Sequence, residues 1–125
     1  MWKRTEQRRI IYDVLSGSDT PLSAPQICER ARQVCPHLGL ATVYRTLKSF
    51  QEAGLAECVE IPGVRPRYQL VRDEHHHHFY CWGCSTVFNV EGCPQGLCEF
   101  SPNGFLTCKH DVILYGWCAS CQEAE

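Results

Sequence analysis

Four cysteines in two identically spaced pairs are the clearest chemical feature of this sequence. Cys81-x-x-Cys84 and Cys118-x-x-Cys121 are separated by 33 residues. Four thiolates drawn from two such pairs suit a closed, tetrahedral zinc site. A redox dithiol is the alternative, but its first cysteine usually begins a helix, whereas the residues after Cys84, STVFNV, are typical of a strand. We therefore predict that these four cysteines hold a structural zinc ion.

A run of four histidines, His75 to His78, lies just before the first cysteine pair. Expression tags usually lie at a terminus, and this run lies well inside the chain. Successive side chains of a strand point to opposite faces, so an extended run separates His75 and His77 from His76 and His78. Each pair can supply two nitrogens to a metal ion, and a polar exposed strand is the alternative.

A metal site built on one histidine pair needs further ligands. His110 is one candidate, on a segment that we expect to return as a strand to the second cysteine pair, and Cys93 is another. Cys98 and Cys108 are instead expected to be small buried hydrophobic residues. The predicted sensory or second site draws on His75, His76, His77, His78, Cys93 and His110.

Length and composition predict a globular protein of one domain or two very small ones. The chain has 125 residues, of which 44% are hydrophobic and 21% charged. No apolar run reaches the roughly 18 residues of a membrane span, and the charged N-terminus does not resemble a signal peptide. A cytoplasmic protein without a membrane partner is predicted, and in the cytosol ten cysteines indicate metal binding rather than disulfides.

Periodic apolar residues predict three helices followed by a hairpin. The helices are expected over 5–15, after a capping box formed by Ser23 and Gln26, and within 39–55, where Gly54 suits the C-terminal cap. The second is expected to bury Ala24, Ile27, Ala31 and Val34, and the third Leu40, Val43, Leu47 and Phe50. The runs LAECVEI and PRYQL flank a Pro62-Gly63 turn and predict the hairpin.

This order of elements is that of a winged helix-turn-helix. The other face of the third helix is expected to turn Thr42, Arg45, Thr46 and Ser49 outward. Short side chains with a nearby Tyr or Arg suit a helix that reads bases and phosphates in the major groove. The net charge of −2 gives no general positive field, although residues 1–9 carry four basic side chains and one acidic one. The alternative is a solvated polar face in a fold that touches no nucleic acid.

The order of motifs resembles the ferric uptake regulator (Fur) family of bacterial metal-dependent repressors. The matching stretches include TEQRRIIYDVL, GLATVYRTLKSFQEAGL, HHHHFYCWGC and HDVILYGWCASC, and they cover nearly the whole chain. The resemblance implies an α+β fold, with an N-terminal winged helix-turn-helix domain over 1–71 and a small C-terminal α/β dimerisation domain with the four-cysteine zinc site over 72–125. It also implies a homodimer that binds a palindromic DNA operator when its sensory metal is bound. A metalloenzyme with a His/Cys zinc centre would need a general base such as Glu91, but the sequence has no H-E-x-x-H motif and no H-x-E motif paired with a deaminase-type C-x-x-C, so the chain is not expected to be an enzyme.

The resemblance also implies residue roles. His76 and His78 match a regulatory site between the domains, so their loss is expected to abolish metal-dependent repression. His75, His77 and His110 match a second site within the dimerisation domain, where loss is expected to reduce stability or tune affinity. The predicted DNA contacts are Lys3, Arg4, Arg8, Thr42, Tyr44 and Arg45.

The sequence departs from the family pattern at several ligand positions. Gln69 and Asn89 stand where the family often has carboxylates, and Pro21 stands where it often has a histidine. The helix that the family carries between the cysteine pairs is shortened to EGCPQGLCEFSPNG, without a clear carboxylate ligand. Cys93 is the expected replacement there, and the candidates to complete the other site are Glu57, Cys58 and Glu91.

Softer ligands in place of oxygen favour zinc over manganese or magnesium. We therefore predict a zinc-responsive repressor of metal-homeostasis genes, with structural Zn²⁺ and one or two further divalent metals per subunit. An iron-responsive regulator using Fe²⁺ is the main alternative. Peroxide sensing is disfavoured, because in the family it depends on the carboxylates that are missing here. A heme sensor is a further alternative, because Cys35-Pro36 or Cys93-Pro94 resembles a heme-regulatory motif. A zinc-ribbon interaction module without DNA binding is the remaining alternative.

Overall fold

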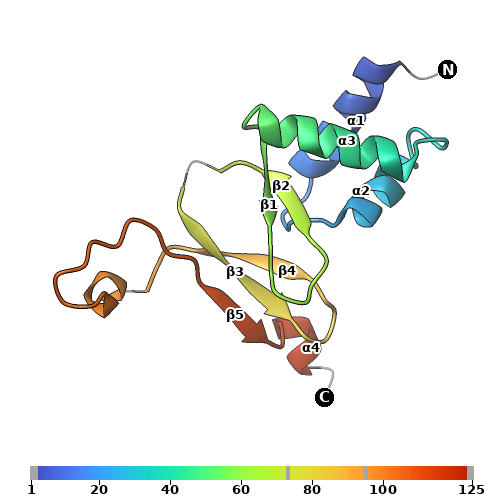
Figure 1. The fold of residues 1–125 in the computed structure, drawn as a ribbon. Coiled ribbons are helices and arrows are strands. Elements are labelled where there is room, and N and C mark those ends of the chain that lie inside the picture. The colour runs from blue at the N-terminus through green and yellow to red at the C-terminus, as the bar shows by residue number, and fades with distance from the viewer. Residues whose placement is uncertain (1–2, 73, 95, 124–125) are drawn as a thin grey trace. The chain divides into compact units, whose positions relative to one another are not determined.

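The computed structural model describes residues 3–72, 74–94 and 96–123, apart from the side chains of Cys98 and Glu123. The chain divides into two compact units, unit 1 over Met1–Val71 and unit 2 over Arg72–Glu125. Unit 1 contains three helices and a hairpin, and unit 2 contains a three-stranded sheet with a short C-terminal helix (Figure 1). Among the described residues, no helix is both long and apolar enough to cross a membrane.

Unit 1 has the predicted order of elements. Its helices are α1 (Arg4–Ser16), α2 (Ala24–Ala31) and α3 (Leu40–Glu52), followed by the antiparallel strands β1 (Ala56–Val59) and β2 (Arg67–Leu70). Leu22 joins the hairpin through two backbone hydrogen bonds with Tyr68, of 2.9 and 2.7 Å. The three helices enclose an apolar core in which Ile11, Ile27 and Leu47 are at most 1% exposed.

The second helix begins as predicted but ends early. The Ser23 side chain accepts a hydrogen bond from the Gln26 backbone N–H, and the Gln26 side chain accepts one from the Ser23 backbone N–H. This capping box satisfies two donors that the helix itself leaves unpaired. Because α2 ends at Ala31, the helical period does not extend to Val34, which is 56% exposed. The predicted burial of Val34 is therefore wrong.

Gly54 ends the third helix as predicted. Its φ of 75° lies in the left-handed region, where glycine carries no steric penalty. The Gly54 N–H donates to the Gln51 carbonyl (3.1 Å) and the Leu55 N–H donates to the Phe50 carbonyl (2.8 Å). This pair of bonds is a Schellman motif, and it directs the chain out of α3 into β1.

The two faces of α3 differ from the prediction at three positions. Leu40, in the first turn, is 39% exposed rather than buried, whereas Thr46 is only 6% exposed rather than turned outward. Ser49 is half-buried and accepts a hydrogen bond of 2.9 Å from Arg8 of α1. The Arg8 guanidinium also lies 5.1 Å above the Phe50 ring, a cation–π contact. Arg8 thus stabilises the packing of α1 against α3.

Unit 2 is built around the histidine run. Strand β3 (His76–Cys81) pairs antiparallel with β4 (Val87–Glu91) and parallel with β5 (Ile113–Gly116), in the order β4-β3-β5. A loop between β4 and β5 contains the short 3₁₀ helix η1 (Leu97–Phe100), and α4 (Ala119–Glu123) follows β5. The expected strand at His110 is wrong, because His110 lies in irregular backbone before β5.

Candidate metal centres and DNA-binding surface

The pairing of β3 with β5 brings the two cysteine pairs together. Cys81 ends β3 opposite Gly116 of β5, and Cys118 follows β5 two residues later. The four sulfur atoms of Cys81, Cys84, Cys118 and Cys121 lie within 4.8 Å of one another, with 3.9 Å between Cys84 and Cys118. A tetrahedral site with Zn–S bonds of about 2.3 Å requires sulfur atoms about 3.8 Å apart. This four-cysteine cluster therefore fits a zinc ion.

Backbone amides of both cysteine pairs point at the Cys81 sulfur. The N–H groups of Gly83 and Cys118 each donate to Cys81 Sγ at 3.3 Å. Burial raises the pKa of Cys81, but backbone hydrogen bonds near Cys84, Cys118 and Gly83 outweigh this effect and lower the pKa to about 6. Hydrogen bonding with the Cys118 and Cys81 side chains raises the pKa of Cys121 to about 12. The cluster thus favours a thiolate at Cys81, the form that binds metal.

Gly83 leaves no room for a larger residue inside the four-cysteine cluster. A Cβ atom there would lie 2.7 Å from Cys121 Sγ and 3.1 Å from the Trp117 ring. We expect Gly83→Ala to displace Cys121 and to weaken zinc binding by about 1–3 kcal/mol, the usual cost of overpacking. Competition with a chromogenic chelator measures this affinity. Gly116→Ala is the control, because its nearest neighbour is a Phe79 ring atom at 3.4 Å; equal zinc affinity in the two variants would contradict the prediction.

A second group of ligands forms around the other predicted residues of unit 2. The donor atoms of His75, His77, Cys93 and His110 lie within 4.8 Å of one another, and we call these residues the histidine–cysteine cluster. Cys93 and His110 lie near the two ends of the loop that joins β4 to β5, two residues after Glu91 and three residues before Ile113.

The distances within the histidine–cysteine cluster are close to those of a tetrahedral metal site. His75 Nε2 lies 3.1 Å from His110 Nε2, and Cys93 Sγ lies 3.2 Å from His77 Nε2 and 3.4 Å from His110 Nε2. Zinc bound by nitrogen at about 2.0–2.1 Å and sulfur at about 2.3 Å places such donors about 3.3–3.6 Å apart. Three nitrogens and one sulfur therefore fit a tetrahedral zinc ion, with no oxygen ligand among the four.

His77 connects this cluster to the start of β5. It is 2% exposed, and burial, followed by the neighbouring His75 and His110 imidazoles, lowers its pKa. The ring is therefore neutral at neutral pH, as a metal ligand must be. The Val112 N–H donates to His77 Nδ1 at 3.0 Å, so the neutral ring carries its proton on Nε2, facing Cys93. A metal held by Nε2 would require the ring proton on Nδ1, and Nδ1 would then no longer accept from the Val112 N–H.

His76 and His78 lie on the opposite face of β3, with ring centroids 5.0 Å apart. In the antiparallel register they stand opposite Glu91 and Asn89 of β4. Glu91, a candidate to complete this site, forms an ion pair with Arg72. Within unit 2, the described residues place no third His, Cys, Asp or Glu donor atom with this pair in a group that could hold a metal ion.

The other predicted ligand positions lie in unit 1. Gln69 donates a hydrogen bond of 2.7 Å to Glu57, which stands opposite it in the hairpin. Cys58 stands opposite Tyr68, and burial followed by the Glu60 charge raises the pKa of its thiol. Pro21 is buried.

The remaining cysteines are not equivalent. Cys108 is exposed, so its predicted burial is wrong, since the β4–β5 loop gives it no core to enter. The Cys98 side chain lies outside the described residues. Cys35 is 1% exposed in the core of unit 1. None of the nine cysteines whose side chains the structure describes is in a disulfide.

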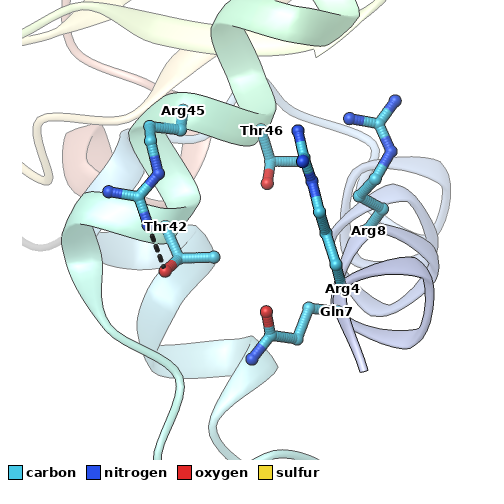
Figure 2. A pocket seen from close by; sticks show the side chains of 6 residues that line it. All are labelled: Arg4, Gln7, Arg8, Thr42, Arg45 and Thr46. Atoms are coloured by element: carbon cyan, nitrogen blue, oxygen red, sulfur yellow. Dashed lines mark hydrogen bonds between the residues drawn. The ribbon is translucent and has the colours of Figure 1, made fainter. Parts of the chain in front are cut away.

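The predicted DNA contacts gather on α1 and α3. Lys3, Arg4 and Arg45 are exposed, as is Tyr44 (43%), and Thr42 is half-buried. A pocket of about 400 Å³ opens between the two helices and is lined by Arg4, Gln7, Arg8, Thr42, Arg45 and Thr46 (Figure 2). Sequence analysis missed Gln7, although its spacing from Arg4 and Arg8 places the three on one helical face.

Comparison with known proteins identifies the fold and the family. The model of the ferric uptake regulator family matches residues 1–115. The ferric uptake regulation protein of Bordetella parapertussis is 32% identical over 125 residues, which is 97% of this chain and 90% of the relative. That of Escherichia coli K12 is 32% identical over 129 residues, covering 98% and 87%.

Solved structures of this family resemble both units of the chain. The Helicobacter pylori ferric uptake regulator, described as having three functional metal-binding sites, aligns with a TM-score of 0.79 at 26% identity, covering 98% of this chain and 84% of that one. A zinc-bound manganese uptake regulator aligns with a TM-score of 0.79 at 30% identity, covering 93% and 90%. The predicted winged helix-turn-helix and dimerisation domain are thereby confirmed. Since the family consists of regulators rather than enzymes, the prediction that the chain is not an enzyme is also confirmed. The chain belongs to the ferric uptake regulator family of metal-responsive, DNA-binding transcriptional regulators.

Proposed function

We propose that this regulator is a cytoplasmic, zinc-responsive repressor of metal-homeostasis genes, with zinc in the four-cysteine cluster for structure and zinc in the histidine–cysteine cluster for sensing. The observation that carries the proposal is the convergence of three imidazoles and one thiol with distances close to tetrahedral. Nitrogen and sulfur donors suit zinc, whereas magnesium and manganese prefer oxygen. Iron is the second candidate, because the curated relatives are named ferric uptake regulation proteins.

The histidine–cysteine cluster is favoured over His76 and His78 as the sensory site. The family resemblance attributes the metal response to His76 and His78, but the oxygen ligands expected beside them are replaced or already engaged. Glu91 is paired with Arg72, and Glu57 accepts a hydrogen bond from Gln69. The Val112 N–H donates to His77 Nδ1, so a metal that moved the ring proton to Nδ1 would break this bond and give the histidine–cysteine cluster a direct effect on the strand that follows.

The exposed apolar edge of unit 2 supports a homodimer. β5 is an outer strand of its sheet, and its unpaired edge is a template for pairing with another strand. Leu114, Tyr115 and Trp117 are 45–46% exposed along and just after this strand. A second copy that pairs there would bury these side chains, and a two-fold dimer suits a palindromic operator.

The exposed side chains of α3 and the basic start of α1 support DNA binding by unit 1. Tyr44 and Arg45 are free to reach base edges and phosphates, while Lys3 and Arg4 add positive charge. Arg8 is already occupied by Ser49 and Phe50, so its part in DNA binding is to hold α1 in position. A heme sensor that uses Cys35 is disfavoured, because Cys35 is buried in the core.

The metal response tests this function directly. Protein carrying only the structural zinc is titrated with zinc, Fe²⁺ or Mn²⁺. Each metal is buffered across its own cellular range of free concentration, because zinc binds most nitrogen and sulfur sites more tightly than iron does at equal concentration. The DNA is a duplex that the metal-loaded protein has selected from a random-sequence library. We expect one further equivalent of zinc to raise DNA affinity by about 5- to 150-fold, the usual range of allosteric coupling. A response to Fe²⁺ alone would replace zinc by iron in this proposal.

A further inference from the structure

The pocket between α1 and α3 has the chemistry of an anion site. Arg4, Arg8 and Arg45 contribute three guanidinium groups to its walls, and Gln7 contributes an amide. No described acidic residue lines the pocket or forms an ion pair with these arginines. Ligand pockets for neutral organic molecules are predominantly apolar, so a negatively charged group is the fitting occupant.

A buried hydroxyl points at the same space. Thr46 is 6% exposed, and the structure gives its side chain no hydrogen bond to any other residue that it describes. In Figure 2 the Thr46 hydroxyl faces the hollow between Arg4 and Gln7 on α1 and Thr42 and Arg45 on α3. The hydroxyl therefore reaches the pocket from an otherwise buried residue, and an anion there would accept a hydrogen bond from it.

The helix termini add to this positive potential. Arg4 and Gln7 lie in the first two turns of α1, and Thr42 and Thr46 lie in the first two turns of α3. Neither helix has a side-chain hydrogen bond at its N-cap, whereas α2, whose residues do not line the pocket, has a complete capping box. The N-terminal N–H groups and the dipoles of both helices therefore favour negative charge at the pocket.

We propose that this pocket holds one phosphate of the DNA backbone, gripped between α1 and α3 by Arg4, Arg45 and the Thr46 hydroxyl. Arg45 is already oriented at the rim, where it donates a hydrogen bond of 3.0 Å to Thr42 Oγ1. A phosphate held by two helices fixes the position of α3 in the major groove without reading sequence. This inference rests on the DNA binding that is part of the proposed function, and it adds Gln7 and Thr46 to the interface.

Paired variants of the full-length, zinc-loaded protein test the site. Arg4→Gln is compared with Arg9→Gln, which removes the same charge from an exposed residue of α1 that does not line the pocket. Binding to the library-selected duplex is measured by fluorescence anisotropy over a range of salt. We expect Arg4→Gln to weaken binding at least about tenfold and to reduce the slope of log affinity against log salt by about 1.8, which is about 0.9 for the phosphate lost in each half-site of the proposed dimer. Equal losses in the two variants would overturn the proposal.

Thr46→Val separates binding from stability. Replacement of the Thr46 hydroxyl by a methyl group of similar size is expected to leave the melting temperature nearly unchanged while weakening DNA binding about fivefold. A lower melting temperature with unchanged DNA affinity would give Thr46 a purely structural role and overturn its part in the site.

Neutral methylphosphonate substitutions, scanned along the duplex, identify the source of the phosphate. We expect one position per half-site at which a methylphosphonate weakens binding of the wild-type protein. At the same position it should not further weaken binding of Arg4→Gln, which already lacks the contact. The proposal would fail if calorimetry shows that the wild-type protein binds inorganic phosphate while the scan shows no such position. The pocket would then bind a free anion. If wild-type protein binds the duplex without any response to zinc, the proposed sensing fails, but the comparison of Arg4→Gln with Arg9→Gln still decides this inference.

Discussion

Replacing Cys81 or Cys118 by serine is expected to release the structural zinc and to unfold unit 2 while unit 1 remains folded. The reason is the size of the unit 2 core. Among the described residues, the buried hydrophobic side chains of unit 2 are Cys81 and Val87, whereas the main apolar cluster lies entirely within unit 1. A unit of this length with so little buried apolar surface needs a metal to fold.

The expected size of this effect follows from zinc energetics. Structural zinc contributes about 10–16 kcal/mol of apparent binding free energy in small zinc-dependent folds, which exceeds the roughly 5–15 kcal/mol stability of an ordinary domain. A serine oxygen replaces a thiolate poorly as a zinc ligand, and Cys81→Ser also exchanges the charged sulfur that accepts from two backbone N–H groups for a neutral hydroxyl on a shorter bond. Loss of unit 2 should also abolish the proposed dimer.

Metal analysis, dimer mass and amide NMR spectra of the two units measure these effects. Cys108→Ser is the matched control, because its thiol is exposed and lies outside both metal clusters. We expect the Cys108→Ser protein to keep its zinc content and its dimer mass. A zinc-free Cys81→Ser protein that is still a folded dimer would show that the four-cysteine cluster is dispensable for the fold.

Local signals in the sequence predicted the elements whose determinants lie close together along the chain. The Ser23–Gln26 capping box set the start of α2, and Gly54 set the end of α3, because each acts through hydrogen bonds within a few residues. The alternation of a strand likewise predicted that His75 and His77 would lie together, as their ring centroids do at 4.5 Å.

The errors arose where packing between distant elements decides the outcome. Periodicity predicts Thr46 to be polar and outward, but α1 packs against that side of α3 and buries it. Cys108 was expected to be a small buried hydrophobe, but its loop has no core to enter. The pocket itself combines α1 and α3, so periodicity of a single helix could not reveal that Gln7 and Thr46 share it.

Two double variants of the histidine run should separate metal sensing from the rest of the strand. His75→Ala with His77→Ala removes two of the four donors of the histidine–cysteine cluster, and we expect it to lose the second zinc ion while keeping the structural one. The DNA affinity gained on adding zinc, about 5- to 150-fold for a typical allosteric coupling, should disappear. Zinc stoichiometry and zinc-dependent DNA binding are the two measurements.

The partner variant, His76→Ala with His78→Ala, is a close control because it removes the same number of imidazoles from the same strand. We expect it to keep both zinc ions and most of the DNA response, since neither metal cluster draws a donor atom from this pair. The opposite result would be a loss of the zinc response when His76 and His78 are replaced and its retention when His75 and His77 are replaced. That result would assign sensing to the site that the family resemblance suggested.

A third readout connects sensing to the fold. The Val112 N–H donates to His77 Nδ1 directly before β5, and His78 N–H donates to the Val112 carbonyl at 3.2 Å. Zinc on His77 Nε2 places the ring proton on Nδ1, so the Val112 amide should lose its acceptor and exchange its hydrogen faster in the zinc-loaded protein. β5 is the strand whose free edge we propose for dimerisation, so a change at Val112 would act on the proposed interface and, through it, on the spacing of two α3 helices on DNA. If hydrogen exchange at the Val112 amide does not change with zinc, zinc binding does not act on β5 through Val112. The two double variants would still test the metal site itself.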